Sequence, residues 1–374
     1  MSDLSSVSSV TESCSQLPAS WYFDPDIYQL EETLFFNRGP AYVGHELMVP
    51  NVGDYHSLEW LDNARVLVRN AEGIELLSNI CRHRQAIMLQ GRGTVRNIVC
   101  PIHRWTYALD GKLLGAPHFP RNPCLDLNKS RLTSWNGLLF AGTRDVAADL
   151  ASMDVAAKLD FSGFVFDRAL VEEYACNWKT FIEVYLEDYH VEPFHPGLGN
   201  FVDVSDLRWQ FGHWYSVQTC GVRNRLAKAG SAVYQRWHEE VLRCGEGNQP
   251  AHGAIWLTYF PNIMVEWYPH SLVVSTLVPR GPEACTNVVE FYYPEEIGLF
   301  EREFVEAEQA AYRETAIEDA EIIARITAGR RVLVQQALDQ RGPYQSPLED
   351  GMQHFHEFIR RELSPHVHDA CHGR

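Results

Sequence analysis

Apolar residues between about 39 and 142 fall in short runs that turn-forming residues interrupt. The runs at 64–69 and 75–80 have the length and composition of β-strands. Asp110-Gly111 predicts a tight hairpin turn, because glycine readily adopts the positive φ that such a turn requires. We therefore expect this part of the chain to form a compact all-β unit.

Helical spacing replaces this pattern after Asp145. Over residues 177–189 the apolar side chains recur at i, i+3, i+4, i+7, i+8 and i+11, which predicts an amphipathic helix. Pro193 is expected to break this helix, because proline lacks a backbone N–H and clashes with the preceding turn. The Glu- and Ala-rich segment from about 294 to 340 predicts one long helix.

The second part of the chain also contains strands. Strand-like runs occupy 254–278, with a break at Pro261-Asn262. A last short helix is expected at 351–363, before a His-rich tail. This mixture of strands and helices indicates an α+β unit.

Composition narrows the class of protein. The chain has 374 residues, of which 45% are hydrophobic and 22% charged, which is typical of a globular protein with one or two domains. Its formal net charge of −17 disfavours nucleic acid and anionic membrane surfaces as partners, because both require a basic face. The sequence contains no run near the ~20 apolar residues of a membrane span. We expect neither a nucleic-acid nor a membrane partner.

The nine cysteines indicate a reducing compartment. Their number is odd, and the first 20 residues have neither the basic start nor the apolar run of a secretory signal. We therefore expect free thiols and a cytoplasmic location. In that setting, closely spaced Cys and His residues point to metal binding.

Two Cys/His pairs each follow a strand-like run: Cys81 with His83, and Cys100 with His103. Three interpretations compete, namely four core residues, a structural zinc ion and a Rieske [2Fe–2S] cluster. Zinc sites more often keep like ligands together, whereas each pair here mixes the two types. A Rieske cluster needs two thiolates on one iron and two imidazoles on the other, so each loop would give one ligand to each iron. The pattern favours the Rieske cluster.

A second group of candidate ligands follows the amphipathic helix. Glu187 and His190 are three residues apart and share a face on a continuous helix, and His195 follows the expected break at Pro193. Two imidazoles and a carboxylate form the facial triad that binds Fe(II) and leaves positions open for oxygen and substrate. The alternative is that both histidines are ordinary polar residues at a helix end. The third ligand would be a distant carboxylate.

Both groups resemble motifs of one family. The stretch 81–111, with Cys-Arg-His-Arg and Cys-Pro-Ile-His, resembles the Rieske domain of Rieske non-haem iron oxygenases, the aromatic-ring-hydroxylating dioxygenase α-subunit family. The stretch 177–196, with Asn-Trp-Lys and then acid-x-x-His-x₄-His, resembles the iron-binding segment of the same family. Gln85 and Arg104 depart from it, since glycine is common at both positions. The resemblance covers nearly the whole chain after Trp21.

The resemblance implies two metal centres, a [2Fe–2S] Rieske cluster and a mononuclear Fe(II). The implied ligands of the cluster are Cys81, His83, Cys100 and His103. The implied ligands of the mononuclear iron are His190, His195 and Asp319. Asp319 lies in the acidic segment 317–322, in which Glu318 is the alternative ligand.

Two catalytic residues are also implied, Glu187 and Asn177. Glu187 corresponds to the acid that links the iron site to the Rieske histidine of a neighbouring subunit, and Asp188 is the rival for this link. Many ring-hydroxylating members have Asp at this position. Glu is more typical of relatives that act on quaternary ammonium or other non-aromatic substrates.

The implied fold class is α+β. Residues 39–145 would form an all-β Rieske domain. Residues 146–374 would form a catalytic domain with an antiparallel β-sheet flanked by helices, of the helix-grip or START-like type. Residues 1–38 would be an N-terminal segment that packs on the catalytic domain.

The implied function is that of the oxygenase component of a Rieske non-haem iron system. It would use O₂ and electrons from an NAD(P)H-dependent reductase or ferredoxin to hydroxylate or dihydroxylate a small organic substrate. The alternatives are N- or O-demethylation of a quaternary ammonium-like substrate and, outside enzymes, an electron carrier with an inactive second site. The family forms head-to-tail rings of three subunits, so we expect a homotrimer.

Other features are interpreted as structural. Five histidines are expected in a surface tail: His354, His356, His366, His368 and His372. Four cysteines are expected to be small buried hydrophobic residues: Cys124, Cys176, Cys220 and Cys285. Four aromatic residues are expected to pack in the core, with a pocket wall as the alternative: Trp256, Tyr259, Trp267 and Tyr268.

Overall fold

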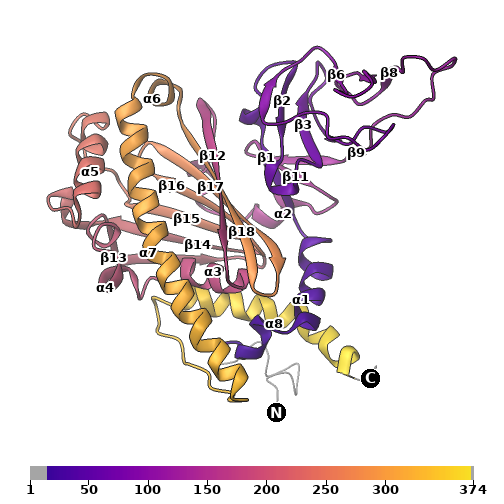
Figure 1. Cartoon of the computed structure of the whole chain (residues 1–374). Helices are drawn as coiled ribbons and strands as arrows, with labels where there is room; N and C mark the ends of the chain where they lie inside the picture. Colours follow the sequence, from indigo (N-terminus) through magenta and orange to yellow (C-terminus); the bar gives the residue numbers. More distant parts are fainter. Residues whose placement is uncertain (1–14, 372–374) are drawn as a thin grey trace. The chain divides into compact units, whose positions relative to one another are not determined.

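The computed structural model describes residues 15–371 of the chain, and these divide into two compact units (Figure 1). One unit is Arg38–Ala148, and the other combines the residues before it with those from Asp149 onward. Within the described residues, no helix has both the length and the apolar composition needed to cross a membrane. The first 14 residues of the expected N-terminal segment and His372 lie outside the described part.

The smaller unit consists of three antiparallel sheets with the strand orders β1-β11-β10, β5-β2-β3-β4-β9 and β6-β7-β8. Its strands are β1 (Ala41–His45), β2 (Asp54–Ser57), β3 (Arg65–Arg69), β4 (Ile74–Ser78), β5 (Arg92–Thr94), β6 (Ile98–Val99), β7 (Thr106–Tyr107), β8 (Leu113–Gly115), β9 (Lys129–Ser130), β10 (Leu132–Trp135) and β11 (Leu138–Ala141). Gly111 has a φ of 88° in the turn between β7 and β8, as its sequence context predicts. The expected all-β unit is confirmed.

The larger unit is built on a seven-stranded antiparallel sheet with the order β12-β18-β17-β16-β15-β14-β13. Its strands are β12 (Phe164–Tyr174), β13 (Val202–Phe211), β14 (Tyr215–Val222), β15 (Ala254–Tyr259), β16 (Ile263–Tyr268), β17 (Ser271–Gly281) and β18 (Ala284–Pro294). The helices are α1 (Pro25–Glu31), α3 (Trp178–Tyr185), α4 (Val191–Phe194), α5 (Ala232–Cys244), α6 (Glu295–Phe300), α7 (Arg302–Gln335) and α8 (Asp350–Cys371), and α2 (Val146–Leu150) spans the boundary between the units. Figure 1 shows the long α7 lying across the sheet. The predicted antiparallel sheet flanked by helices is confirmed.

The face of the sheet that α7 covers follows from strand alternation. Successive residues of a strand point to opposite faces, so Glu266 and Tyr268 of β16 share one face. Val273 pairs with Glu266 across β17 and with Phe291 across β18, which places both partners on that same face. A hydrophobic cluster fills the space beneath, with Val273 and Phe291 packed against Phe304 of α7. Glu266 is therefore a buried carboxylate on the face that α7 covers, and this face also carries the buried polar residues Ser275 and Asn287.

The helix predicted over 177–189 ends earlier than its apolar pattern suggests. The α3 helix stops at Tyr185, a short break follows, and α4 begins at Val191. In the break, the backbone N–H of Asp188 donates to the carbonyl of Leu348 at 2.8 Å, in place of an intrahelical bond. Pro193 was expected to break the helix, yet it lies in the first turn of α4, where the missing N–H has no intrahelical partner to lose.

Two other predicted helix boundaries were wrong. The single helix expected over 294–340 is divided at Glu301, which has φ −114° and ψ 60°. The expected surface tail is helical through residue 371, and its His356 is fully buried against Glu183. Helical propensity alone does not distinguish one helix from two, and the amphipathic pattern near the C-terminus does not reveal a buried ion pair. His354 also lies in α8, at hydrogen-bond distance from Ser216.

The cysteine expectation holds for three of four residues. Cys176, Cys220 and Cys285 are fully buried. Cys124 is exposed, which contradicts its expected burial, and it lies in a connecting segment with φ 55°. A connecting loop has no strand or helix face to turn inward, so periodicity gives no information about burial there.

A buried ion pair attaches the N-terminal segment to α3. Lys179 Nζ lies 2.5 Å from Glu31 Oε1, and both side chains are fully buried. The indole N–H of Trp178 also donates to Glu31, at 2.8 Å. Burial raises the pKa of Glu31 and lowers that of Lys179, while their mutual attraction opposes both shifts. Each charge therefore depends on the other to remain in the core.

Removing one partner of this pair is expected to destabilise the larger unit. Lys179→Met should lower the free energy of unfolding by about 3–5 kcal/mol, because it leaves the Glu31 carboxylate buried without a cation. Urea unfolding followed by circular dichroism measures the effect. The double variant Glu31→Leu with Lys179→Met should recover most of the loss, and an unchanged unfolding midpoint for the single variant would contradict this account.

Candidate metal centres and substrate pocket

The Cys and His candidates of the smaller unit lie on two loops, one after β4 and one between β6 and β7. Cys81 and Cys100 are each only 1% exposed. The rings of His83 and His103 have their centroids 4.6 Å apart. The two loops thus bring two thiols and two imidazoles together.

Each loop turns back through a residue with left-handed backbone geometry. The N–H of Gln85 donates to the Cys81 carbonyl at 3.0 Å, and Gln85 has a φ of 55°. The N–H of Arg104 donates to the Cys100 carbonyl at 3.1 Å, and Arg104 has a φ of 59°. Glycine avoids the cost of roughly 1–2 kcal/mol that other residues meet in this conformation. Gln85 and Arg104, which stand where the family commonly has glycine, therefore form the same turns but with a strained backbone.

The residues on these loops fit a [2Fe–2S] cluster. His83 stacks on Trp105 with a centroid distance of 5.0 Å and an interplanar angle of 6°. Its Nδ1 atom is buried and has no hydrogen-bond partner among the described residues, which suits a metal ligand. The Tyr107 hydroxyl lies 3.6 Å from Cys81 Sγ, within hydrogen-bond distance for sulfur. A zinc ion would need all four ligand atoms around one point. Among the described residues, the group of three or more candidate ligand atoms that lie within 4.8 Å of one another is in the larger unit and not on these two loops.

That convergence is formed by His190, His195 and Asp319, whose ligand atoms lie within 4.8 Å of one another. His195 Nε2 is 3.0 Å from Asp319 Oδ1, and His190 Nε2 is 3.5 Å from the same oxygen. His195 is 1% exposed, and the other two residues are partly buried. Two imidazole nitrogens and a carboxylate oxygen facing one point match the donor set of a mononuclear non-haem iron site.

Two further carboxylates orient the imidazoles from outside. Glu187 Oε1 lies 2.5 Å from His190 Nδ1, and Glu318 Oε2 lies 2.7 Å from His195 Nδ1. An Nδ1–H that donates to a carboxylate leaves the Nε2 lone pair free to point inward. Of the two acids considered as the third ligand, Asp319 therefore faces the centre and Glu318 faces the outer side of His195.

The contact between Glu187 and His190 does not depend on helix geometry, contrary to the expected shared helix face. Both residues lie in the break between α3 and α4. The Glu187 carboxylate accepts from the backbone N–H of His190 at 3.1 Å as well as from its ring. Asp188, the rival acid, is 3% exposed and its Oδ2 atom has no hydrogen-bond partner in the described part of the chain.

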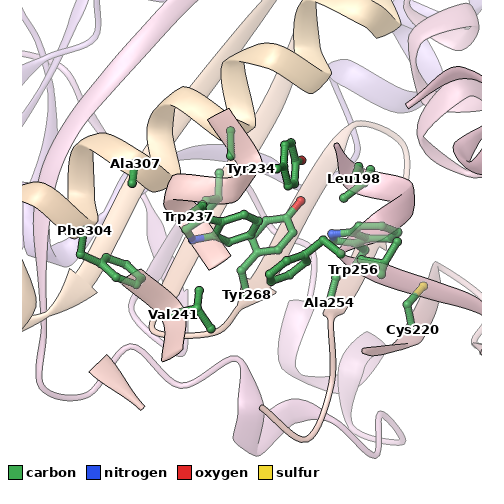
Figure 2. Close-up of a cluster of buried hydrophobic side chains, with 14 of the residues drawn as sticks. Leu198, Cys220, Tyr234, Trp237, Val241, Ala254, Trp256, Tyr268, Phe304 and Ala307 are labelled. Atoms are coloured by element: carbon green, nitrogen blue, oxygen red, sulfur yellow. The ribbon is translucent and has the colours of Figure 1, made fainter. Parts of the chain in front are cut away.

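A cavity of about 100 Å³ adjoins the three convergent residues. One wall is a single face of α7, because its lining residues are spaced by three or four positions: Glu308, Tyr312, Thr315, Asp319 and Ile323. The opposite wall includes aromatic rings from α3, α5 and the sheet: Tyr185, Trp237, Trp256 and Tyr268. Figure 2 shows Trp237, Tyr268 and Trp256 clustered below Tyr234 and Leu198. Aromatic side chains thus contribute to more than one wall of the cavity.

The lining is strongly acidic. Five carboxylates line the cavity, and the described lining contains neither Lys nor Arg: Glu187, Asp188, Glu266, Glu308 and Asp319. Burial raises the pKa of Glu266 to about 7, although hydrogen bonds from two tyrosine hydroxyls lower it. Burial also raises the pKa of Glu308 to about 8. These carboxylates are costly to ionise in the empty cavity.

Comparison with known proteins agrees with both centres. Residues 157–364 match the model of the ring hydroxylating alpha subunit (catalytic domain), and residues 40–132 match that of the Rieske [2Fe–2S] domain. The chain belongs to the family of Rieske ring-hydroxylating oxygenases. This oxygenase is 63% identical over 363 residues to the putrescine 2-hydroxylase of Ralstonia nicotianae, an alignment that covers 97% of this chain and 100% of that protein.

Two other relatives place the oxygenase within its family. It is 53% identical to the putrescine 2-hydroxylase of Bordetella bronchiseptica, over 97% of this chain and 88% of that protein. The crystal structure of a quaternary ammonium Rieske monooxygenase matches with a TM-score of 0.76 and 19% identity, over 93% of this chain and 95% of that one. The latter likeness concerns the fold.

Family membership defines the cofactors and the reaction class. The oxygenase carries a Rieske [2Fe–2S] cluster and a mononuclear iron. It is the oxygenase component of a system in which a reductase or ferredoxin supplies electrons, and it uses O₂ to hydroxylate an organic substrate. These conclusions agree with the activity and cofactors expected from the two sequence motifs.

Asn177, for which a catalytic role was predicted, does not line the cavity. It caps the N-terminus of α3, where its Oδ1 accepts from the N–H of Lys179 at 3.0 Å. Its Nδ2 donates to the carbonyls of Tyr22 and Pro282, and the residue is absent from the cavity lining. Its side chain is thus occupied by backbone contacts that position α3.

Some lining residues were not predicted from sequence. Glu266 interrupts an apolar run in residues 263–268, and this lone acid was a signal that could have identified it. Glu308 gives no such signal, because α7 is acidic throughout. Trp256 and Tyr268 line the cavity, whereas core packing was expected.

The other two aromatic residues lie elsewhere. Tyr259 is buried and donates to Asp149 at 2.6 Å, and Trp267 is only partly buried.

Iron analysis separates the two candidate third ligands. Asp319→Ala should lower bound iron from about three to about two per chain while about two acid-labile sulfides remain, because the cluster ligands are untouched. Glu318→Gln should retain close to the full iron content, since it contacts only the outer nitrogen of His195. Anaerobic purification followed by iron and sulfide assays checks both variants. The reverse result would assign the ligand role to Glu318.

Proposed function

We propose that this oxygenase hydroxylates a short aliphatic diamine, putrescine, at carbon 2. The two curated relatives with this printed activity are 63% and 53% identical and align along 97% of the chain. The observation that carries the proposal is the charge of the cavity wall. Buried carboxylates without a Lys or Arg partner in the described lining favour a substrate that brings positive charge.

The charge balance favours a dication. Glu187 and Asp319 are engaged with the imidazoles, so Asp188, Glu266 and Glu308 remain as lining carboxylates. A diamine is doubly protonated at neutral pH and would compensate two of them. A zwitterionic amino acid or betaine would also bring a carboxylate, for which this wall offers no cation. A neutral aromatic hydrocarbon would leave Asp188, Glu266 and Glu308 without a cation.

The size of the cavity agrees with a small aliphatic substrate. A volume of about 100 Å³ has room for roughly seven to ten water-sized atoms. A four-carbon diamine has six non-hydrogen atoms and therefore fits in this space. The aromatic rings of Trp237, Trp256 and Tyr268 would cover the methylene groups and attract the ammonium groups through their faces.

Demethylation of a quaternary ammonium compound is the second candidate, and the aromatic wall favours it. A trimethylammonium group has no N–H to donate, so it would leave the oxygens of Glu266 and Glu308 without a hydrogen bond from the substrate. A primary ammonium donates three hydrogen bonds and satisfies them. The acids therefore favour the diamine over the quaternary ammonium compound.

We assign roles in the reaction to the residues near the two centres. Cys81, His83, Cys100 and His103 would hold the cluster in a domain of residues 39–145, and His190, His195 and Asp319 would hold the mononuclear iron in a domain of residues 146–374 with residues 1–38 packed on it. When bound, the mononuclear iron supplies oxygen activation. Glu187 would orient His190 and link it to a histidine of the cluster, so that electrons could pass along this contact. The aromatic wall would exclude water from the reacting carbon.

We also propose a cytoplasmic homotrimer in which electrons cross between subunits. Tyr189 and Ile317 lie close in sequence to the iron ligands and are 59% and 62% exposed, so a neighbouring chain has apolar surface to cover beside the site. A head-to-tail interface of this kind closes into a ring. A reducing compartment agrees with the seven cysteines whose side chains the structure describes, all of which are free.

Product analysis tests the substrate. The reconstituted enzyme with a reductase, NADH and O₂ should convert putrescine to 2-hydroxyputrescine, with one oxygen atom from ¹⁸O₂ in the product. The wall carboxylates provide the physical reason, because they select the protonated diamine. Mass spectrometry measures the product. Release of formaldehyde from a quaternary ammonium compound, with no turnover of putrescine, would support the second candidate instead.

Mixed oligomers test the trimer. A chain with Cys100→Ser should lack the cluster, and a chain with Asp319→Ala should lack the mononuclear iron, so each homo-oligomer should be inactive. Co-expressed mixtures should regain activity if the cluster of one subunit serves the iron of the next. Light scattering should give three chains per particle. Inactive mixtures of stable trimers would restrict electron transfer to within one chain.

A further inference from the structure

Three carboxylates follow one another along the cavity. Asp319 and Glu308 occupy the same face of α7, roughly 16 Å apart along the axis at the helical rise. Glu266 projects from β16 toward the part of α7 that lies between them, because the Tyr312 hydroxyl donates to it at 3.2 Å. The cavity therefore has an iron end at Asp319 and an acidic end at Glu266 and Glu308.

Glu266 is built into this end as a carboxylate ready to accept hydrogen bonds. The residue is 2% exposed. The Tyr268 hydroxyl donates to one of its oxygens at 2.7 Å, and the Tyr312 hydroxyl donates to the other at 3.2 Å. The described lining contains no Lys or Arg that could neutralise it. A carboxylate has about four acceptor positions, so two hydroxyl donors leave capacity for a ligand.

Glu308 reinforces the negative charge at the same end. It is 1% exposed, and the Tyr293 hydroxyl donates to it at 2.6 Å. Two buried carboxylates close to each other repel, so ionising both is unfavourable until a cation enters between them. Glu308 lies about one helical turn before Tyr312 in α7, so it is farther than Tyr312 from Asp319.

Some other polar atoms in the described lining have no hydrogen-bond partner from the protein. The Nε1 atom of Trp256 and the Oδ2 atom of Asp188 have no hydrogen-bond partner among the residues described. Both residues are more than nine-tenths buried. Buried polar groups are normally satisfied, so these atoms point to a polar ligand in the cavity. Tyr268 lies beside the indoles of Trp237 and Trp256, at centroid distances of 5.8 and 6.2 Å (Figure 2). Because the Tyr268 hydroxyl donates to Glu266, this aromatic wall adjoins the carboxylate.

We infer that Glu266, reinforced by Glu308, binds the ammonium group of the substrate that lies farther from the iron and thereby selects diamines over monoamines. This inference rests on the proposed function and identifies the residues that determine its specificity. The nitrogens of an extended four-carbon diamine are roughly 6 Å apart at ordinary bond lengths. Such a molecule would reach from the iron end toward Glu266, which makes Glu266 the primary contact and Glu308 the supporting charge.

A comparison of putrescine with n-butylamine tests the inference. The two substrates differ in the distal ammonium alone, so the ratio of their kcat/KM values reports on the group that binds it. The parent enzyme should prefer putrescine strongly. Glu266→Gln should lower this ratio by at least about 30-fold, mainly through a higher KM for putrescine, because the amide cannot compensate a buried cation. Glu308→Gln should lower it less.

A matched control is available in β18. Glu290 is 1% exposed and accepts from the Tyr292 hydroxyl at 2.7 Å, as Glu266 accepts from Tyr268, but it is not part of the cavity lining. Glu290→Gln should leave the substrate ratio unchanged. The visible spectrum of the Rieske cluster and the bound iron show that each variant is folded and loaded.

The outcomes separate the inference from the proposed function. Failure of the parent enzyme to hydroxylate putrescine would contradict the proposed function. Turnover of putrescine by the parent, with an unchanged ratio in Glu266→Gln, would overturn the inference alone. If Glu266→Gln does not fold, Tyr268→Phe and Tyr312→Phe each remove one donor from Glu266 and should lower the same ratio by several-fold. An unchanged ratio in both would equally overturn it.

Discussion

The meeting of one Asp319 oxygen with the Nε2 atoms of two imidazoles determines how the larger unit is assembled. It joins α7 to the segment between α3 and α4, over a separation of 124 residues between His195 and Asp319. The imidazoles are turned toward this point because Glu187 and Glu318 hold their outer nitrogens. Convergent donor atoms with oriented rings are what a metal ion requires of a protein before it binds.

The same helix extends this centre into a substrate cavity. Because side chains three or four residues apart share a helix face, α7 contributes Asp319, Tyr312 and Glu308 to a single wall. The sheet contributes Glu266 and Tyr268 opposite them. Carboxylates in such a place reduce stability while the cavity is empty, and a cationic ligand that binds only the folded state restores it. The charge of the wall is thus more selective than its shape.

Buried polar contacts outside the cavity hold the supporting helices. Glu183 of α3 accepts from Tyr22 and lies 2.6 Å from Arg330 of α7 and 2.8 Å from His356 of α8. Burial opposes the ionisation of Glu183, but Arg330 and His356 outweigh it and hold its pKa at about 2. Together with the ion pair between Lys179 and Glu31, this network ties α1, α3, α7 and α8 to one another. The helix that carries Asp319, and the α3 helix that precedes the two histidines, are therefore positioned by buried groups that need one another.

The sequence by itself determined the fold class and the motifs whose residues are close along the chain. The two Cys/His pairs and the acid-x-x-His-x₄-His segment are read from spacing, because covalent geometry limits how far apart near neighbours can lie. The strands at 64–69 and the hairpin at Gly111 follow from local pattern in the same way. The helix end at Tyr185 does not, because the bond from Asp188 to Leu348 replaces the helical bond and comes from a distant segment.

Only the tertiary structure decided which distant acids meet the local motifs. Glu318 and Asp319 are adjacent in an acidic helix and point in directions about 100° apart around its axis. The acidic composition of this segment therefore does not show which of the two faces the imidazoles. The packing of α7 on the sheet turns Asp319 toward the imidazoles and Glu318 behind them. The same packing brings Glu266 and Glu308 into one wall. Burial of a charge depends on neighbours supplied by strand pairing and helix packing, and a linear pattern of residues does not contain those neighbours.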